Sequence, residues 1–347
     1  MLSGIRHGIT SGAPITLLVN NKESQNWIHV MSASEVNLLD KEVIEQMEAK
    51  SIKRFRPGHA DLSGTIKYRQ RDIRDVLERS SARETAARVA AGALCQQVLD
   101  YCGAKSTAHV LQIGDIKANL DTSSMSIDAI DAKARAADLL CIDHKAAEEM
   151  KVLINKKWQE GDTLGGVVEV IVEGLPIGLG SYTQWDLKLD GKLAQALMSV
   201  QAVKAIEMGD GINSARKPGS LTHDAIYPAN DNGPLPFKRT TNYAGGLEGG
   251  MTNGERLVVR AYMKPLPTLR TSLPSLSFPE FTEQTAHYER SDVCAVSACA
   301  IVCKAMVSIV LTGALLDKFG GDNSVDLKNA VDQYKDYCSK LAENVKA

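Results

Sequence analysis

Arginine side chains dominate the segments in which residue types and spacing indicate chemistry. Arg54, Arg56 and His59 stand in a basic loop that Pro57 and Gly58 interrupt. Arginine binds phosphate or carboxylate through paired hydrogen bonds, and histidine can move a proton near neutral pH. The loop therefore predicts an anion site with a proton-transfer group, although a solvated loop histidine explains His59 as well.

A second cationic cluster surrounds the predicted start of a helix. Ser81 and Glu84 fit a Ser-x-x-Glu capping box, and apolar residues recur at helical spacing as far as Val98, before Gly103. Cations at a helix N-terminus oppose the helix dipole, so a bound phosphate would account for them. Ion pairs with neighbouring carboxylates are the alternative. Three arginines lie on or beside this end: Arg79, Arg83 and Arg88.

Two segments in the second half of the chain carry weaker signals of the same kind. The paired glycines 245–246 and 249–250 would let a ligand approach the backbone, although tight hairpin turns explain them equally well. Two prolines in the segment 264–268 fix an extended backbone. That segment either positions Lys264 and Thr268 for binding or forms a surface turn.

Arg290-Ser-Asp292 precedes the most apolar stretch of the chain, residues 293–316. Lys304 stands in the middle of this stretch, which alanine, serine and cysteine also dilute, so we predict a buried helix rather than a membrane span. Asp292 is then either the N-cap of that helix or a carboxylate that acts as a base.

The elements that must position these residues are helices and strands in alternation, without a visible linker or repeat. Hydrophobic periodicity and turn residues favour a single α+β domain over residues 1–347, with helices against antiparallel strands. We expect strands at 14–20, 167–172 and 256–263, a hairpin at 242–254, and helices at 42–50, from Ser81, within 126–158 and at 193–206.

Composition narrows the classes of function. The chain has 40 basic and 42 acidic residues and a net charge of −2, which argues against a nucleic-acid or membrane partner. Its seven cysteines are odd in number and include no Cys-x-x-Cys pair, which favours reduced thiols in a cytoplasmic protein over disulfides or a metal site.

Together, the motifs resemble those of chorismate synthases in order and spacing, from about Ser3 to Leu315. The resemblance implies a β-α-β sandwich with helices between antiparallel sheets, assembled as a homotetramer. It also implies elimination of phosphate from 5-enolpyruvylshikimate 3-phosphate to give chorismate, with reduced FMN as a cofactor that lends and recovers an electron. The motifs that carry it are Arg56-Pro-Gly-His-Ala-Asp61, the run Glu78–Gly92, Asn242-x-Ala-Gly-Gly-x-x-Gly-Gly250, Met263-Lys-Pro-x-Pro-Thr268 and Arg290-Ser-Asp292.

The same resemblance implies a role for individual positions. His59 would serve proton transfer to the flavin, and Asp292 would help to deprotonate the flavin N5 region. The substrate's phosphate and carboxylates would contact Arg56, Arg83 and Arg290. The flavin would contact Arg79, Ser80, Ser81, Gln201, Ala202, Gly249, Lys264, Thr268 and Arg290.

Three departures from the family pattern leave alternatives open. Gln201 stands where asparagine is usual, Lys304 stands where glutamate is usual, and the N-terminal Gly-Glu-Ser-His-Gly motif with its arginine-rich stretch is not in this sequence. A non-catalytic member that folds, binds flavin and oligomerises is therefore the alternative. A bifunctional member that also reduces flavin with NADPH would usually carry extra sequence, and none is evident.

The absent motif predicts weak or no lyase activity for the chain as given, and rescue when the family's N-terminal segment is restored. Loss of general acid–base help alone costs about 10²–10⁴ in rate, and lost arginines would add to that through poorer substrate orientation. Phosphate release under oxygen-free, reducing conditions, with the short and extended chains side by side, measures the difference. Full activity of the short chain would contradict the expectation.

Overall fold

A five-stranded antiparallel sheet forms the centre of the protein. The computed structural model describes residues 1–229 and 235–341. The strand order in the sheet is β4-β3-β5-β11-β6. Val- and Ile-rich sequences explain the buried central strands, because β-branched side chains pack well on a pleated surface. The strands are β3 (Lys105–Ile113), β4 (Ile116–Lys117), β5 (Gly166–Glu173), β6 (Val203–Met208) and β11 (Leu257–Met263).

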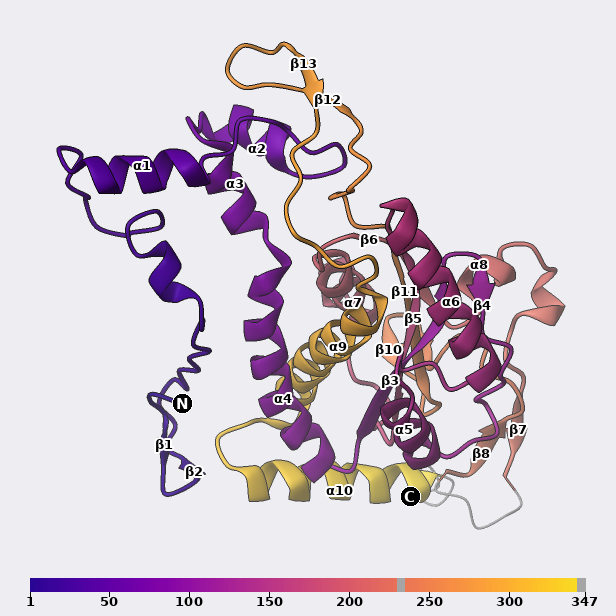
Figure 1. The fold of residues 1–347 in the computed structure, drawn as a ribbon. Helices are drawn as coiled ribbons and strands as arrows, with labels where there is room; N and C mark the ends of the chain where they lie inside the picture. The colour runs from indigo at the N-terminus through magenta and orange to yellow at the C-terminus, as the bar shows by residue number, and fades with distance from the viewer. Residues whose placement is uncertain (230–234, 342–347) are drawn as a thin grey trace.

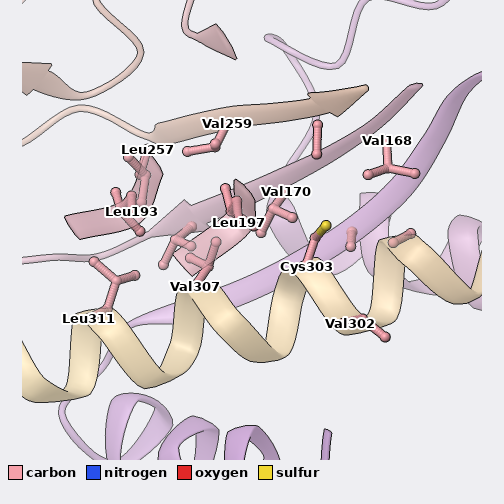
Figure 2. Close-up of a cluster of buried hydrophobic side chains, with 14 of the residues drawn as sticks. Val168, Val170, Leu193, Leu197, Leu257, Val259, Val302, Cys303, Val307 and Leu311 are labelled. Carbon is pink, nitrogen blue, oxygen red and sulfur yellow. The ribbon is translucent and has the colours of Figure 1, made fainter. Parts of the chain in front are cut away.

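One face of this sheet is covered by α9 (Val296–Phe319), the longest helix among the described residues. Cys303, Val307 and Leu311 point from α9 toward the sheet, where Val170 and Val259 belong to the same buried cluster (Figure 2). By length and apolarity this helix would suffice to cross a membrane, but most of its apolar window is buried inside the protein. The burial matches the prediction of a core helix.

Helix α4 (Thr85–Tyr101) lies against α9 at very short range. A Cβ placed on Gly92 would lie 2.5 Å from Cβ of Ala305 and 2.6 Å from its Cα. Thr312 Oγ1 donates a hydrogen bond of 3.1 Å to the carbonyl of Cys95. Glycine is therefore required at this crossing, because any side chain would push the two helices apart.

The opposite face of the sheet carries a row of charged side chains across four strands. His109 Nε2 lies 3.0 Å from Glu169 Oε1, and Arg260 Nε donates to Glu169 Oε2 at 2.7 Å. Arg260 also reaches Glu207 at 3.4 Å, and Tyr262 donates to Glu207 at 2.6 Å. Burial and this hydrogen bond raise the pKa of Tyr262 to about 12. Each buried charge in the row thus has a partner of opposite sign.

The remaining elements surround this core. Helix α5 packs Ile127 and Ile130 on Ile171, on the face that carries the charged row. The other helices are α1 (Lys41–Lys50), α2 (Asp61–Tyr68), α3 (Ile73–Ser80), α5 (Ile127–Ala136), α6 (His144–Glu160), α7 (Leu189–Met198), the one-turn α8 (Gly211–Ser214) and α10 (Ser324–Ser339). The two-stranded ladders are β1–β2 (Ile5–Arg6, Ile9–Thr10), β7–β8 (Ile226–Pro228, Phe237–Arg239), β9–β10 (Leu247–Glu248, Met251–Thr252) and β12–β13 (Pro274–Leu276, Glu283–Thr285).

The α+β class is confirmed, as are the helix near 42–50, the strands at 167–172 and 256–263, and the hairpin within 242–254. The predicted strand at 14–20 is wrong. Only an isolated bridge between Ser3 and Thr16 forms there, because no neighbouring strand pairs with the segment. The helical region 126–158 is two helices, α5 and α6. The single-domain assignment stays a prediction.

Two predicted helix boundaries are wrong for tertiary reasons. The helix expected at 193–206 ends at Met198, because Val203–Met208 instead pairs with β11 at the sheet edge. Asp292 does not cap α9, whose N-cap is Ala295. A hydrogen bond of 2.8 Å from Leu164 N–H to the Val293 carbonyl holds the chain extended there.

The Gly92 crossing predicts opposite effects for two glycine-to-alanine substitutions. Gly92→Ala should lower the free energy of unfolding by about 1–3 kcal/mol, because the new methyl overpacks the contact with Ala305. Gly313→Ala in α9 is the matched control, since a Cβ there meets nothing within 4 Å, and it should stabilise by up to about 1 kcal/mol. Urea unfolding of both variants measures this. Equal stability of the two would show that α4 and α9 can separate freely.

Candidate active site

Six chain segments meet around a cavity of about 630 Å³. They are the N-terminal segment 21–31, the loop before α2, helix α3 with its junction to α4, the turn before β6, the segment that follows β11 and the segment that precedes α9. The volume lies in the range of small-molecule sites. Its charged and catalytic-type lining residues are Arg56, His59, Arg74, Glu78, Arg83, Lys264, Glu289 and Arg290.

A buried cluster of Arg56, His59 and Asp61 forms one wall of this cavity. Arg56 donates through Nε and Nη2 to the two oxygens of Asp61 at 2.8 and 3.0 Å. Its Nη1 lies 3.3 Å from Thr268 Oγ1. His59 Nδ1 lies 2.5 Å from Asp61 Oδ1. Asp61 begins α2, and its side chain is fully buried.

The charge state of Asp61 determines the tautomer of His59. Burial would raise the pKa of Asp61, but hydrogen bonds from His59 and Arg56, together with their charges, lower it to about 2. An ionised carboxylate only accepts hydrogen bonds, so the 2.5 Å contact with Asp61 favours a hydrogen on Nδ1 of His59 over the role of acceptor from Arg56 Nη2, which lies 2.9 Å from the same nitrogen. In the neutral ring the other nitrogen, Nε2, is therefore the one that exchanges a proton.

Lys264 reaches across the cavity to the same loop. Its Nζ donates a hydrogen bond to the carbonyl of Gly58, which has a φ of +77° and no side chain in the way. Burial, together with the charge of Lys204, lowers the pKa of Lys264. Its backbone N–H donates to the carbonyl of Ala202 at 2.9 Å. The segment after β11 is thereby fixed to both neighbouring loops.

The α3–α4 junction contributes the residues from Ser80 to Arg83. Ser81 caps a single 3-10 turn, Ala82–Glu84, by accepting from the N–H of Arg83 at 3.3 Å, and α4 begins only at Thr85. The predicted capping box is therefore wrong, because Glu84 pairs with Arg88 at 2.7 Å instead. The Arg83 side chain lines the cavity and is 75% exposed.

Gln201 and Ala202 form the floor beside this junction. Gln201 Nε2 donates to Glu84 Oε1 at 2.7 Å, while its Oε1 is buried and has no hydrogen-bond partner. Ala202 adopts a φ of +66°, a conformation that L-residues rarely accept. Strained backbone and an orphaned acceptor at a cavity wall are typical of a ligand site.

The sequence analysis did not identify Arg74 or Glu289 as site residues, and it did not predict that Asp61 pairs with Arg56 and His59. Arg74 is buried on α3 and donates to the Lys50 carbonyl at 2.8 Å, while its Nη2 lies 2.9 Å from Glu289 Oε1. No local pattern could have paired Arg74 with Glu289, which lies more than 200 residues away. Asp61 stands within a quoted motif, but its complete burial depends on tertiary packing.

Known proteins resemble this chain over most of its length. A family model described as chorismate synthase matches residues 1–316. The chain is 46% identical to the chorismate synthase of Shouchella clausii over 334 residues, which are 96% of this chain and 84% of that protein. It is 48% identical to that of Brevibacillus brevis over 341 residues, which are 98% and 85% of the two chains.

A solved structure described as a chorismate synthase crystal structure is similar, with a TM-score of 0.70 and 39% identity, covering 81% of this chain and 77% of that one. The chain belongs to the chorismate synthase family. It is accordingly a carbon–oxygen lyase that eliminates phosphate from 5-enolpyruvylshikimate 3-phosphate to give chorismate. A cavity with more cations than carboxylates is consistent with such an anionic substrate.

The cavity brings together most of the residues that the chorismate synthase resemblance implies. Arg79, Gly249 and Asp292 do not line it. Arg79 is exposed on α3, and Asp292 is exposed before α9. Gly249 lies in the β9–β10 turn, where a Cβ would meet nothing within 4 Å. The positions that line the cavity are Arg56, His59, Ser80, Ser81, Arg83, Gln201, Ala202, Lys264, Thr268 and Arg290.

The depressed pKa of Asp61 predicts a specific acid sensitivity. Ionised Asp61 stabilises the fold fully above its ordinary pKa of 3.8, and this contribution is lost as the pH falls through about 2. The shift corresponds to about 2 kcal/mol. The difference in free energy of unfolding between the unsubstituted chain and Asp61→Asn should therefore shrink by that amount between pH 5 and pH 2.

Urea unfolding at a series of pH values measures this difference. Asp322→Asn serves as the control, because Asp322 is an exposed carboxylate near the end of α9. Its difference from the unsubstituted chain should stay within about 0.5 kcal/mol throughout. A pH-independent difference for Asp61→Asn would mean that Asp61 is not held ionised by Arg56 and His59.

Proposed function

We propose that phosphate elimination takes place in the cavity between the α2 loop and the α3–α4 junction, with His59 as its proton-transfer group. The observation that carries this proposal is the buried Arg56–Asp61–His59 cluster. It fixes the orientation of the imidazole and leaves Nε2 to exchange a proton. Three more cations line the same cavity: Arg83, Lys264 and Arg290. Their positive charge would stabilise a phosphorylated dicarboxylate.

The cations divide into two groups by their partners. Arg56 and Arg74 are buried and tied to carboxylates, so they shape the walls and contribute a fixed field. Arg83 is largely exposed, and its nearest carboxylate oxygen, on Glu23, is 3.9 Å away. Arg83 therefore has hydrogen-bond donors to offer a phosphate, and we assign it to substrate binding together with Arg290 and Arg56, which line the same cavity.

Reduced FMN is the cofactor that we infer for this site. The buried, unpaired Oε1 of Gln201 calls for a hydrogen-bond donor, and a flavin ring N–H is one. Ser80, Ser81, Ala202, Lys264 and Thr268 line the same cavity and would complete the contacts. When bound, reduced FMN would supply the electron that assists departure of phosphate and would recover it afterwards. Closure of the walls around the ligands would exclude water and strengthen each ionic contact.

Three residues to which the family resemblance gives a role do not line the cavity, and their roles remain proposals. Asp292 as a base and Arg79 and Gly249 as flavin contacts would each need a rearrangement or a neighbouring subunit. We also propose a homotetramer and a cytoplasmic location. The odd number of cysteines and the lack of a Cys-x-x-Cys pair in the sequence support that location. The use of NADPH to regenerate the flavin is a further proposal.

The test is anaerobic phosphate release from 5-enolpyruvylshikimate 3-phosphate with reduced FMN. The chain as given and a form with the family's N-terminal segment are assayed together, and substitutions are made in the more active one. His59→Asn should lower the rate by about 10²–10⁴ through loss of the proton-transfer group. Binding of reduced FMN, followed by its absorbance, should change little.

His144→Asn is the matched control, because His144 is exposed at the first residue of α6 and does not line the cavity. This variant should keep the unsubstituted rate. A His59→Asn protein with full activity would remove His59 from the mechanism. Phosphate release that does not depend on reduced FMN would overturn the cofactor assignment.

A further inference from the structure

A second cavity, of about 330 Å³, opens between α4, α5, β3 and α9. It shares no lining residue with the first cavity. Its walls are mainly apolar, with a few polar groups among them. The residues that line it are Val89, Gly92, Ala93, Gln96, Ala108, Asp131, Ala134, Arg135, Leu140, Ile301, Lys304, Ala305 and Ser308.

Lys304 places an ammonium group in this apolar surrounding. Its side chain is only 19% exposed, and burial lowers its pKa. Asp131 Oδ1 is the closest carboxylate oxygen, at 4.0 Å from Nζ, which is too long for a hydrogen bond. A cation removed from water normally lies in direct contact with an acceptor, so this arrangement calls for one.

The polar neighbours of Lys304 are already engaged with other residues. Asp131 Oδ1 accepts from Thr107 Oγ1 at 3.0 Å, and its Oδ2 accepts from Arg135 Nε at 2.6 Å. Gln96 Oε1 accepts hydrogen bonds from Ser106 and Ser308. Among the residues that line the cavity, Lys304 and Arg135 carry two positive charges against the one carboxylate of Asp131. Asp100 lies outside the lining and accepts from Gln96 Nε2 at 2.7 Å, so the cavity wall itself has one positive charge in excess.

We propose that this cavity binds a small monoanion with a compact apolar body, such as an arylalkyl or branched aliphatic carboxylate. The carboxylate accepts from Lys304 Nζ, and the apolar body packs between Val89, Leu140 and Ile301. One excess charge matches a single carboxylate, and the size is at the small end of ligand sites. The site is separate from the lyase cavity and does not depend on the function proposed there.

Isothermal titration with 3-phenylpropanoate and its neutral amide, 3-phenylpropanamide, tests the proposal on the full chain. The acid should bind about 10-fold or more tightly than the amide, because only the acid forms a charge-assisted hydrogen bond with Lys304. Lys304→Met keeps the unbranched apolar stem and removes the charge. It should weaken the acid by about 10- to 100-fold and leave the amide unchanged.

Three control variants locate the binding site. Lys192→Met removes a lysine from the groove between α7 and α9 and should leave affinity for the acid unchanged. Arg83→Ala, at the lyase cavity, should also leave it unchanged. Ala93→Trp fills the second cavity from an exposed position of α4 and should abolish binding of both probes.

Several results would overturn the proposal. They are no saturable binding of the acid, equal affinity for acid and amide, and unchanged affinity in Lys304→Met. Loss of binding in Arg83→Ala alone would place the anion in the lyase cavity instead. Circular dichroism on each variant separates these outcomes from misfolding, and Lys304→Met is expected to fold because it replaces a buried charge with an apolar side chain.

Discussion

The close contact between α4 and α9 is the constraint on which both cavities depend. Gly92 allows the backbone of α4 to approach Ala305, and Thr312 Oγ1 fixes the register by donating to the carbonyl of Cys95. Because α9 is itself held on the central sheet (Figure 2), α4 has a single position relative to that sheet. Its N-terminal end then carries Ser81–Arg83 to the lyase cavity, and its middle forms a wall of the second cavity.

Paired charges impose the next level of order. Arg56 and Asp61 are almost completely buried, and Arg260 and Glu169 are partly buried. In each pair, the attraction between the opposite charges offsets the free-energy cost of removing them from water. The first role of these ion pairs is to stabilise the fold. The groups left for ligands are those whose partners are distant, and Arg83 and Lys304 are the two clearest cases. Arg83 and Lys304 each line a cavity, as the paired Arg56 also does, but only the first two keep hydrogen-bond donors free of a close carboxylate.

Local sequence patterns predicted much of the fold and many of the residues that line the site. They did not predict which of these residues contact one another. The strand 257–263, the helix near 42–50 and the buried helix after residue 293 follow from periodicity and burial along the chain itself. The segment 203–206 was predicted as the end of a helix, because its choice of strand depends on pairing with β11. Ten positions that the resemblance implies line one cavity, whereas the pairing of Arg74 with Glu289 and the burial of Asp61 depend on tertiary packing.

Lys304 shows why a motif and a charge distribution give different information. Sequence placed it in the middle of an apolar helix, where a lysine indicates either a long side chain that reaches solvent or a buried charge with a partner. The structure supports neither in full, because the side chain is mostly covered and Asp131 is already committed to Thr107 and Arg135. Arginine-rich motifs support the proposed lyase site, while an unbalanced cation in an apolar cavity supports the proposed second site, which no motif marks.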